Sequence, residues 1–511
     1  MELTVKIIEA DGLPDAEREI LARLVSTYNS HAAANALKRR YYEGHIKLGE
    51  VNLGLALPHG MCGLEIGCAW GEKAVDVLAA RSMFDGFVGA NGEDAEVMNR
   101  IMNGNRLQAE YMKACRDELK YGCTFATLSS DPQVGCRIRF HSPETAAALW
   151  DGEKGRISAG FAIIATDKVR EYDLPVPTVV NLHTDDSLWV LRRNKDDMEW
   201  TAERYPHVMG RPLMEPLVWN ATSAKPFGRS RLKEPVRRLI QGYVRTVANA
   251  TIGLEFSTSP QKYLLGVSDD QYDAIINDKF RQYVGSIIAS TTNPETGEKP
   301  SFGQLSQGTI EPHVQMMRTL ATQFSAATGL TVTDVGVVND ANPTSSEAIL
   351  AQSQTLILMA EQLNAGNGDA LYTIAQMAQA IALDLHPEDL DEALRDVVPH
   401  FKNPAMPSVA VMADAAIKIA TARPEFAQTD VFILTSTGLR HTENLIHTKS
   451  DFCGCLQHCR PSFKPCPPSS GRSLLNCEPL HVPLTWAHDT HCPAMQILCR
   501  FPGDGWEGDE K

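Results

Sequence analysis

The sequence predicts an α+β fold in which an antiparallel β-sheet lies between two helical regions. Up to residue 120, most segments place apolar residues on one side at helical spacing. From 123 to 219 the pattern changes to short β-branched and aromatic runs such as CRIRFHS and ISAGFAIIAT, which turn residues separate. After residue 230 the helical period returns. We expect strands this closely spaced to pair antiparallel. Together with the helices on either side in the sequence, they make an α+β fold.

Three helices are expected before the sheet. The first spans 14 to 40, where charged residues alternate with an apolar face. The second spans 69 to 82, and a longer third helix spans 93 to 120. Gly122 ends the third helix, because glycine readily adopts the left-handed conformation that closes a helix.

Two further helices are expected after the sheet. The first covers 230 to 255, where apolar residues recur on one side. Residues 257 to 310 are mixed and include a short predicted helix at 268 to 280. The second helix covers 311 to 328 and leads into an apolar loop.

The longest predicted helix covers 344 to 383. Thr344 and Glu347 form a capping box at its start, and Pro343 stops any helix that would run in from before. An apolar or small residue then recurs every seven positions from Ile349. Unbroken, this helix would be about 60 Å long at 1.5 Å per residue.

This helix has an unusual composition. Asn367 interrupts the apolar stripe between two glycines, so we expect a kink or break there. Glu361 and Asp369 are the only charged residues after the first turn. We therefore expect the helix to pack on more than one side. The alternative interpretation is a core helix of an ordinary large domain.

The C-terminal part differs from the rest. A short extended piece at 397 to 408 and a helix at 407 to 422 are expected, and periodicity ends beyond 436. Residues 441 to 511 contain seven cysteines, six histidines and eight prolines. We interpret this segment as a disordered tail from out-of-register coding or a replaced C-terminus. Its candidate zinc ligands are Cys453, Cys455, His458, Cys459 and Cys466, but their spacing fits no recognised zinc finger, so no metal site is predicted.

Composition limits the classes of function. The 48 basic and 63 acidic residues give a net charge of −15, typical of a soluble acidic protein. The start lacks a signal-peptide pattern, and no run approaches the roughly 18 apolar residues of a membrane span. A cytosolic setting without a membrane is therefore expected. The five cysteines before residue 137 are expected to be ordinary buried thiols.

The sequence predicts no enzyme and no cofactor. No phosphate-binding loop of the form GxxxxGK[ST] occurs, and no catalytic set of Ser, His, Asp or Cys has local support. LEIGCAWGEKA at 64 to 74 resembles the glycine-rich first motif of S-adenosylmethionine-dependent methyltransferases. That motif requires repeated βαβ units, whereas helix follows helix here, so the methyltransferase remains an alternative only.

Basic residues crowd the helix that follows Gly228. They include Arg237, Arg238 and Arg245, which are candidate contacts to nucleic acid or to an acidic partner. A solvated helix face with salt bridges to its neighbours is the favoured interpretation, and both remain open.

Several motifs follow one another in a fixed order along the chain. They are RRYYEG at 39–44, CAWGEKAVDVLAARSMFDGF at 68–87, LKYGCTFATL at 119–128, PLVWNATSAKPFGRSRL at 216–232 and FSAATGLTVTDVGVVNDANPTSSEAI at 324–349. In their order and spacing, these motifs resemble the portal proteins of tailed bacteriophages of the siphophage type. The resemblance covers roughly 20 to 430.

The resemblance implies a portal-like subunit: a helix-rich wing that carries the antiparallel sheet, a two-helix stem, a small α/β clip and a long wing helix. The chain differs from the family at the C-terminus, where the family has a helical crown and this sequence predicts an irregular tail. The implied parts are a wing at 1–229, stem helices at 230–256 and 311–328, a clip at 257–310, a tunnel loop at 329–343, the long wing helix and its return at 344–405, the start of a crown at 406–436 and an atypical tail at 437–511.

The implied function is a homo-oligomeric ring, usually a dodecamer, at one capsid vertex of the virion. Double-stranded DNA is packaged and ejected through such a ring without sequence specificity. The implied partners are the terminase large subunit, a major capsid or scaffolding protein and a head-completion adaptor protein, met in the host cytoplasm during assembly. The residues expected to face DNA are Val332, Val335, Val337, Val338 and Asn339.

A net acidic chain suits a conduit, because clustered cations would hold DNA rather than let it slide. Another self-assembling phage structural protein, such as a tail or capsid component, is the remaining alternative.

Overall fold

The computed structural model describes most of the chain up to residue 405. The chain divides into two units, Met1–Arg440 and His441–Lys511, and every described residue belongs to the first. The predicted tail and the helix expected at 268–280 lie outside the described residues, as does nearly all of the helix expected at 407–422. The described residues are 5–47, 65–89, 95–167, 175–194, 199–258, 262–265, 297, 299, 301–304, 309–336, 346–405, 417–418 and 421.

The N-terminal region is helical, as predicted. A 3₁₀-helix at Val5–Glu9 precedes the long helix α1, and the four α-helices are α1 (Asp15–Tyr42), α2 (Trp70–Ala79), α3 (Glu96–Asn105) and α4 (Leu107–Tyr121). Gly122 ends α4 with a positive φ of 113°, as the sequence predicts.

The prediction of a single helix at 93–120 is wrong, because the helix breaks at Arg106, which has a left-handed φ of 51°. Asn105 explains the break. Its buried side chain donates from Nδ2 to the backbone oxygen of Cys136 at 2.8 Å and accepts at Oδ1 from the backbone N–H of Ile138 at 3.0 Å. The helix end is thus bonded to a neighbouring strand, which offsets the left-handed residue.

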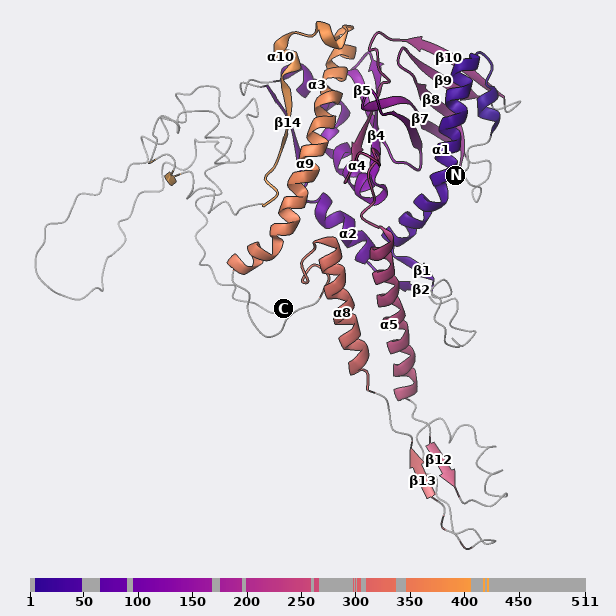
Figure 1. The fold of residues 1–511 in the computed structure, drawn as a ribbon, viewed down its shortest axis with the longest axis vertical. Helices are drawn as coiled ribbons and strands as arrows, with labels where there is room; N and C mark the ends of the chain where they lie inside the picture. The colour runs from indigo at the N-terminus through magenta and orange to yellow at the C-terminus, as the bar shows by residue number, and fades with distance from the viewer. Residues whose placement is uncertain are drawn as a thin grey trace, which may run out of the picture. The chain divides into compact units, whose positions relative to one another are not determined.

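Two antiparallel sheets follow α4, which confirms the predicted α+β class (Figure 1). The strand order is β10-β9-β8-β7-β6 in the larger sheet and β11-β4-β5 in the smaller one. Every ladder between described strands is antiparallel. The strands are β4 (Cys123–Asp131), β5 (Gly135–His141), β6 (Ala146–Asp151), β7 (Arg156–Asp167), β8 (Val176–His183), β9 (Ser187–Arg193), β10 (Trp200–Pro206) and β11 (Met214–Val218).

Three short pairs of strands join segments that are distant in sequence. The extended piece expected after 396 is β14 (Val397–Phe401), which pairs with β3 (Phe84–Gly89), a strand that the sequence did not predict. The other pairs are β1 (His45–Lys47) with β2 (Glu65–Gly67) and β12 (Lys262–Leu265) with β13 (Ser301–Gln304). A 3₁₀-helix at Pro387–Asp389 and the short α10 (Glu392–Arg395) precede β14.

Helices α5 (Glu234–Thr258) and α8 (Glu311–Thr328) lie side by side (Figure 1). A side chain just before α5 reaches the last residue of α8, so the two helices run antiparallel. Ile240 and Val244 on α5 and Phe324 on α8 are fully buried. Gly242 on α5 lies close to α8, since an added Cβ there would come within 3.3 Å of the Leu320 side chain. The sequence therefore provides one apolar face on each helix.

The longest helix, α9, runs from Ser346 to Leu383 and spans about 57 Å at 1.5 Å per residue. The break expected at Asn367 does not occur. Instead Asn367 faces the interior, where its side chain is fully buried. As expected, α9 packs on more than one side: it contacts the smaller sheet, β14, α2 and α3. The main apolar core includes residues of α2, α3, α4, α5, α8 and α9.

Candidate functional site at a helix junction

The described part of the loop expected to face DNA is an ordered turn. Gly329 ends α8 with a left-handed φ of 71°. The carboxylate of Asp334 accepts from the backbone N–H of Thr331 at 3.0 Å and from its hydroxyl at 2.8 Å. The hydroxyl of Thr331 in turn accepts from the backbone N–H of Asp334 at 3.2 Å. These reciprocal bonds give the loop a fixed start.

The five residues expected to face DNA are not all described. Val332 and Val335 are half-buried, and Val335 packs against the main core within this one chain. Val337, Val338 and Asn339 lie outside the described residues. The structure therefore does not test whether the five lie together, and their role stays a prediction.

The three basic residues singled out on α5 have different surroundings. Arg237 folds back, donates to the backbone oxygen of Leu232 and lies 5.9 Å from the ring of Tyr41. Arg238 is exposed and makes an ion pair with Glu234 at 2.6 Å. Arg245 is exposed and engaged in an interaction. The Arg238–Glu234 pair is of the kind expected on a solvated helix face, and a contact of these residues with nucleic acid or an acidic partner stays a prediction.

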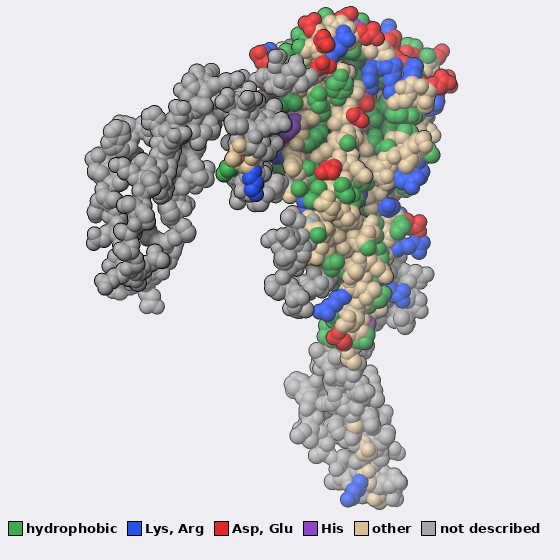
Figure 2. All heavy atoms as spheres, turned by 60° about the vertical axis from the view of Figure 1, so that its left-hand side comes forward, with side chains coloured by type: hydrophobic (Ala, Val, Ile, Leu, Met, Phe, Trp, Pro, Cys, Tyr) green, Lys and Arg blue, Asp and Glu red, His purple; other side chains and the backbone are tan. Residues whose placement is uncertain are grey.

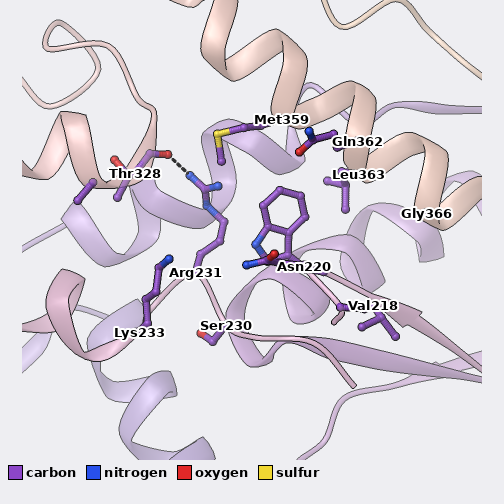
Figure 3. A pocket seen from close by; sticks show the side chains of 13 residues that line it. Val218, Asn220, Ser230, Arg231, Lys233, Thr328, Met359, Gln362, Leu363 and Gly366 are labelled. Atoms are coloured by element: carbon purple, nitrogen blue, oxygen red, sulfur yellow. Dashed lines mark hydrogen bonds between the residues drawn. The ribbon is translucent and has the colours of Figure 1, made fainter. Parts of the chain in front are cut away.

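A cavity of about 450 Å³ lies where α5, α8 and α9 meet the end of the smaller sheet (Figure 3). Its volume is in the range of small-ligand pockets. None of the described residues around it is acidic. They are Val218, Trp219, Asn220, Ala221, Ser230, Arg231, Lys233, Ala327, Thr328, Met359, Gln362, Leu363 and Gly366.

Arg231 forms the floor of this cavity and is 5% exposed. Its Nη2 donates to the backbone oxygen of Thr328 at 2.5 Å, and its Nε donates to the backbone oxygen of Ala74. The guanidinium also lies 5.8 Å from the ring of Trp219. Burial lowers the pKa of Arg231 to about 10, so the side chain is still a cation at neutral pH.

Arg231 therefore joins three elements: α2 through Ala74, the C-terminal end of α8 through Thr328, and the loop after β11 through Trp219. The last carbonyl groups of a helix have no partner within the helix, and a cation there is favoured by the helix dipole. Arg231 lies in the basic stretch after Gly228, but the sequence does not indicate this role. The available signal was the stretch from 216 to 233, which has four cations and no acid.

Three stacked aromatic rings hold the same junction. Trp70 at the start of α2 lies 4.2 Å from the ring centre of Tyr243 on α5 and 4.8 Å from that of Phe324 on α8. Such pairs contribute about 0.5–1.5 kcal/mol beyond their area burial. They fix the helix pair against the N-terminal region.

A second buried polar group lies between α4 and α9. The amide of Asn367 donates to Glu118 Oε2 at 2.8 Å and to the hydroxyl oxygen of Tyr111 at 2.9 Å. Glu118 is fully buried, and desolvation raises its pKa to about 8, against the opposing hydrogen bond from Asn367. Glu118 is thus mainly a neutral acid at pH 7.

Gly71 of LEIGCAWGEKA has a packing role. An added Cβ on Gly71 would come within 1.9 Å of the backbone oxygen of Tyr41, so Gly71 allows α2 to lie directly against the end of α1. The strand β2 before it pairs antiparallel with β1, whereas the methyltransferase motif requires a parallel βαβ unit. This geometry disfavours the methyltransferase alternative.

The four described cysteines, Cys68, Cys115, Cys123 and Cys136, are free and buried, as expected. In the described part of the chain, no group of three or more His, Cys, Asp or Glu side chains is placed to hold a metal ion. Among the same residues, no helix combines the length and apolar character that crossing a membrane requires.

Comparisons with known proteins give only distant matches. No protein-family model and no curated protein matches the chain. The solved structures with a similar chain include the virion of the native gene transfer agent (GTA) particle, at 13% identity and a TM-score of 0.39 over 73% of this chain and 90% of that chain. Both measures are too low to establish a common fold or function.

Two structures of the neck of the GTA particle match in the same way. The neck of the empty particle, computed with C6 symmetry, has 12% identity and a TM-score of 0.41 over 73% of this chain and 91% of that chain. The neck of the native particle, computed with C12 symmetry, has 11% identity and a TM-score of 0.42 over 73% and 90%.

Proposed function

We propose that this protein is a structural portal subunit. Copies of it form a ring, a dodecamer in the pattern of the family it resembles, at one vertex of a phage-type capsid. Double-stranded DNA enters and leaves through the ring, which docks the terminase large subunit, a capsid or scaffolding protein and a head-completion adaptor. The protein acts in the host cytoplasm during assembly and then in the virion.

The observation that carries this proposal is the antiparallel pair of α5 and α8. The resemblance implies two stem helices at 230–256 and 311–328, and helices occur at Glu234–Thr258 and Glu311–Thr328. They pack on each other, and the 38-residue α9 is the next helix described after α8 along the chain. The chain order expected for stem, tunnel loop and wing helix is thus compatible with the described elements.

Exposed apolar side chains on these helices favour a ring. Leu254 on α5, Met316 on α8 and Leu358 on α9 are 45%, 48% and 50% exposed. One face of the molecule carries charged side chains mainly at one end, and its middle is largely hydrophobic or uncharged (Figure 2). A neighbouring copy that covered such surface would bury apolar area that a monomer leaves in water.

Negative-stain electron microscopy of the purified protein tests the proposal. We expect rings with a central opening. Met316→Asp and Leu254→Asp are expected to abolish the rings and leave the circular-dichroism spectrum unchanged, because a charge is costly to bury between copies.

Val208→Asp is the matched control, because Val208 is 63% exposed but lies outside the three helices. Rings that persist in both helix variants would contradict the proposal that these helix faces contact the neighbouring copy. A stable monomer, or an open filament or tail-like tube, would contradict the portal and favour another structural protein.

A further inference from the structure

The cavity at the helix junction has no role in the proposed ring. We propose that it is a binding site for a phosphate group, with Arg231 and Lys233 as its cations. The proposal depends only on this chain's own residues, so it is independent of ring formation.

The charge around the cavity differs from that of the whole chain. The chain has a net charge of −15, yet the described residues that line the cavity include two cations and no acid. Figure 3 shows Arg231 directed between Thr328 and Met359, with Lys233 beside it. Two unopposed cations next to each other repel, and an anion between them removes that repulsion.

Arg231 is the stronger evidence, because a buried charge is normally paired. Its two hydrogen bonds go to backbone carbonyl groups, which carry only partial charge. No carboxylate among the described residues forms an ion pair with it, and its Nη1 has no hydrogen-bond partner among them. Nη1 is not shielded from solvent either, so it is free to donate to a ligand in the cavity.

Further donors at the cavity are also uncommitted. Lys233 is exposed and makes no ion pair within the described part of the chain. The side-chain amides of Asn220 and Gln362 are exposed and make no hydrogen bond to described residues. By contrast, the hydroxyls of Ser230 and Thr328 already donate to backbone oxygens at 2.5 and 2.7 Å.

The free donors thus lie on different sides of the cavity: Arg231 and Lys233 come from the segment before α5, Asn220 from the loop after β11 and Gln362 from α9. A phosphate group matches this arrangement, because it presents several acceptor oxygens in different directions and carries a charge that Arg and Lys both recognise. The apolar side chains of Met359 and Leu363 complete the wall and lower the local dielectric, which strengthens the charged contacts.

Thermal unfolding of the full chain tests the site with inorganic phosphate as the probe. We expect the Tm to rise with phosphate concentration at constant ionic strength held with chloride, since a ligand that binds only the folded state stabilises it. Lys233→Met is expected to weaken the apparent affinity for phosphate about tenfold, which corresponds to about 1.4 kcal/mol. Lys233 is exposed, so this change should not impair folding.

Lys225→Met is the matched control, because it removes the same charge from the nearby loop but outside the cavity lining. It is expected to respond to phosphate as the wild type does. Gln362→Glu supplies a carboxylate within the cavity and is expected to abolish the phosphate response. No rise in the Tm of the wild type, or an equal rise in Lys233→Met, would overturn the proposal.

A second experiment, with a short DNA duplex as the probe, distinguishes the source of the phosphate group. If the duplex binds the wild type and Lys233→Met lowers that affinity, the site takes a phosphate of the nucleic-acid backbone. If only inorganic phosphate stabilises the wild type, the site takes a free phosphate. Stabilisation by acetate as strong as that by phosphate at equal ionic strength would contradict the phosphate class.

Discussion

At the scale of single residues, the buried Asn367 and Glu118 show how a polar side chain holds two helices in register. Asn367 lies on α9 and Glu118 on α4, and their 2.8 Å hydrogen bond is closed off from water. Within the described part of the chain, Glu118 Oε1 and Asn367 Oδ1 have no hydrogen-bond partner, and a proton on the carboxyl removes the need to bury a charge there.

The raised pKa of Glu118 gives a prediction about pH. Because the folded-state pKa is about 8 and the ordinary pKa of a Glu carboxyl is 4.5, the stabilising contribution is complete below pH 4.5 and is lost as pH rises through 8. We expect Glu118→Gln, which stays neutral, to remove this loss. Denaturant unfolding of both proteins at pH 5 and pH 8.5 measures the free energy of unfolding. We expect its difference between the two pH values to be smaller in Glu118→Gln than in the wild type.

Glu110→Gln on the same helix, where Glu110 is partly exposed, is the control for removal of a carboxyl. If Glu118→Gln and the wild type lose equal stability between the two pH values, Glu118 is not the group responsible.

At the scale of elements, the position of the helix pair depends on Phe324, which is fully buried and stacks on Trp70. We expect Phe324→Ala to lower the free energy of unfolding by about 3–5 kcal/mol, because it leaves a cavity between α2, α5 and α8. Gln323→Ala, at an exposed position on α8, is expected to change it by less than about 0.5 kcal/mol. Chemical unfolding of both variants compares them, and equal effects would show that the aromatic contact does not fix the junction.

The loop between α8 and α9 gives a second prediction at this scale. If residues 337 and 338 border the DNA path, Val337→Asp and Val338→Asp place negative charge next to DNA phosphates, so in vitro packaging should fall. The exposed Thr333→Asp, in the ordered turn of the same segment, is the comparison. Unchanged packaging by the two valine variants would argue that this loop does not line the channel.

At the scale of the whole molecule, the tail is expected to be dispensable. Residues 441–511 form a unit separate from Met1–Arg440, and their Cys/His/Pro-rich composition differs from that of the remainder. We expect a chain ending at Arg440 to keep its circular-dichroism spectrum and its ring formation in electron microscopy. Loss of assembly in this truncation would contradict the interpretation of the tail.

Local patterns in the sequence determined the elements that depend on local physics. The helical period gave α9 within a few residues of its observed bounds, and glycine at 122 marked the end of α4. Alternating β-branched runs gave the antiparallel strands. In these elements the period of apolar residues and the backbone preference act within a few residues, so no distant contact is needed to predict them.

Only the tertiary structure decided features whose partners are distant in sequence. The break at Arg106 depends on hydrogen bonds from Asn105 to β5, and β3 exists because it pairs with β14 more than 300 residues later. Arg231 was visible as a basic residue, but its place on a cavity floor depends on carbonyl groups of Ala74 and Thr328. Long-range pairing has no local period, because the chain must first fold to bring these groups together.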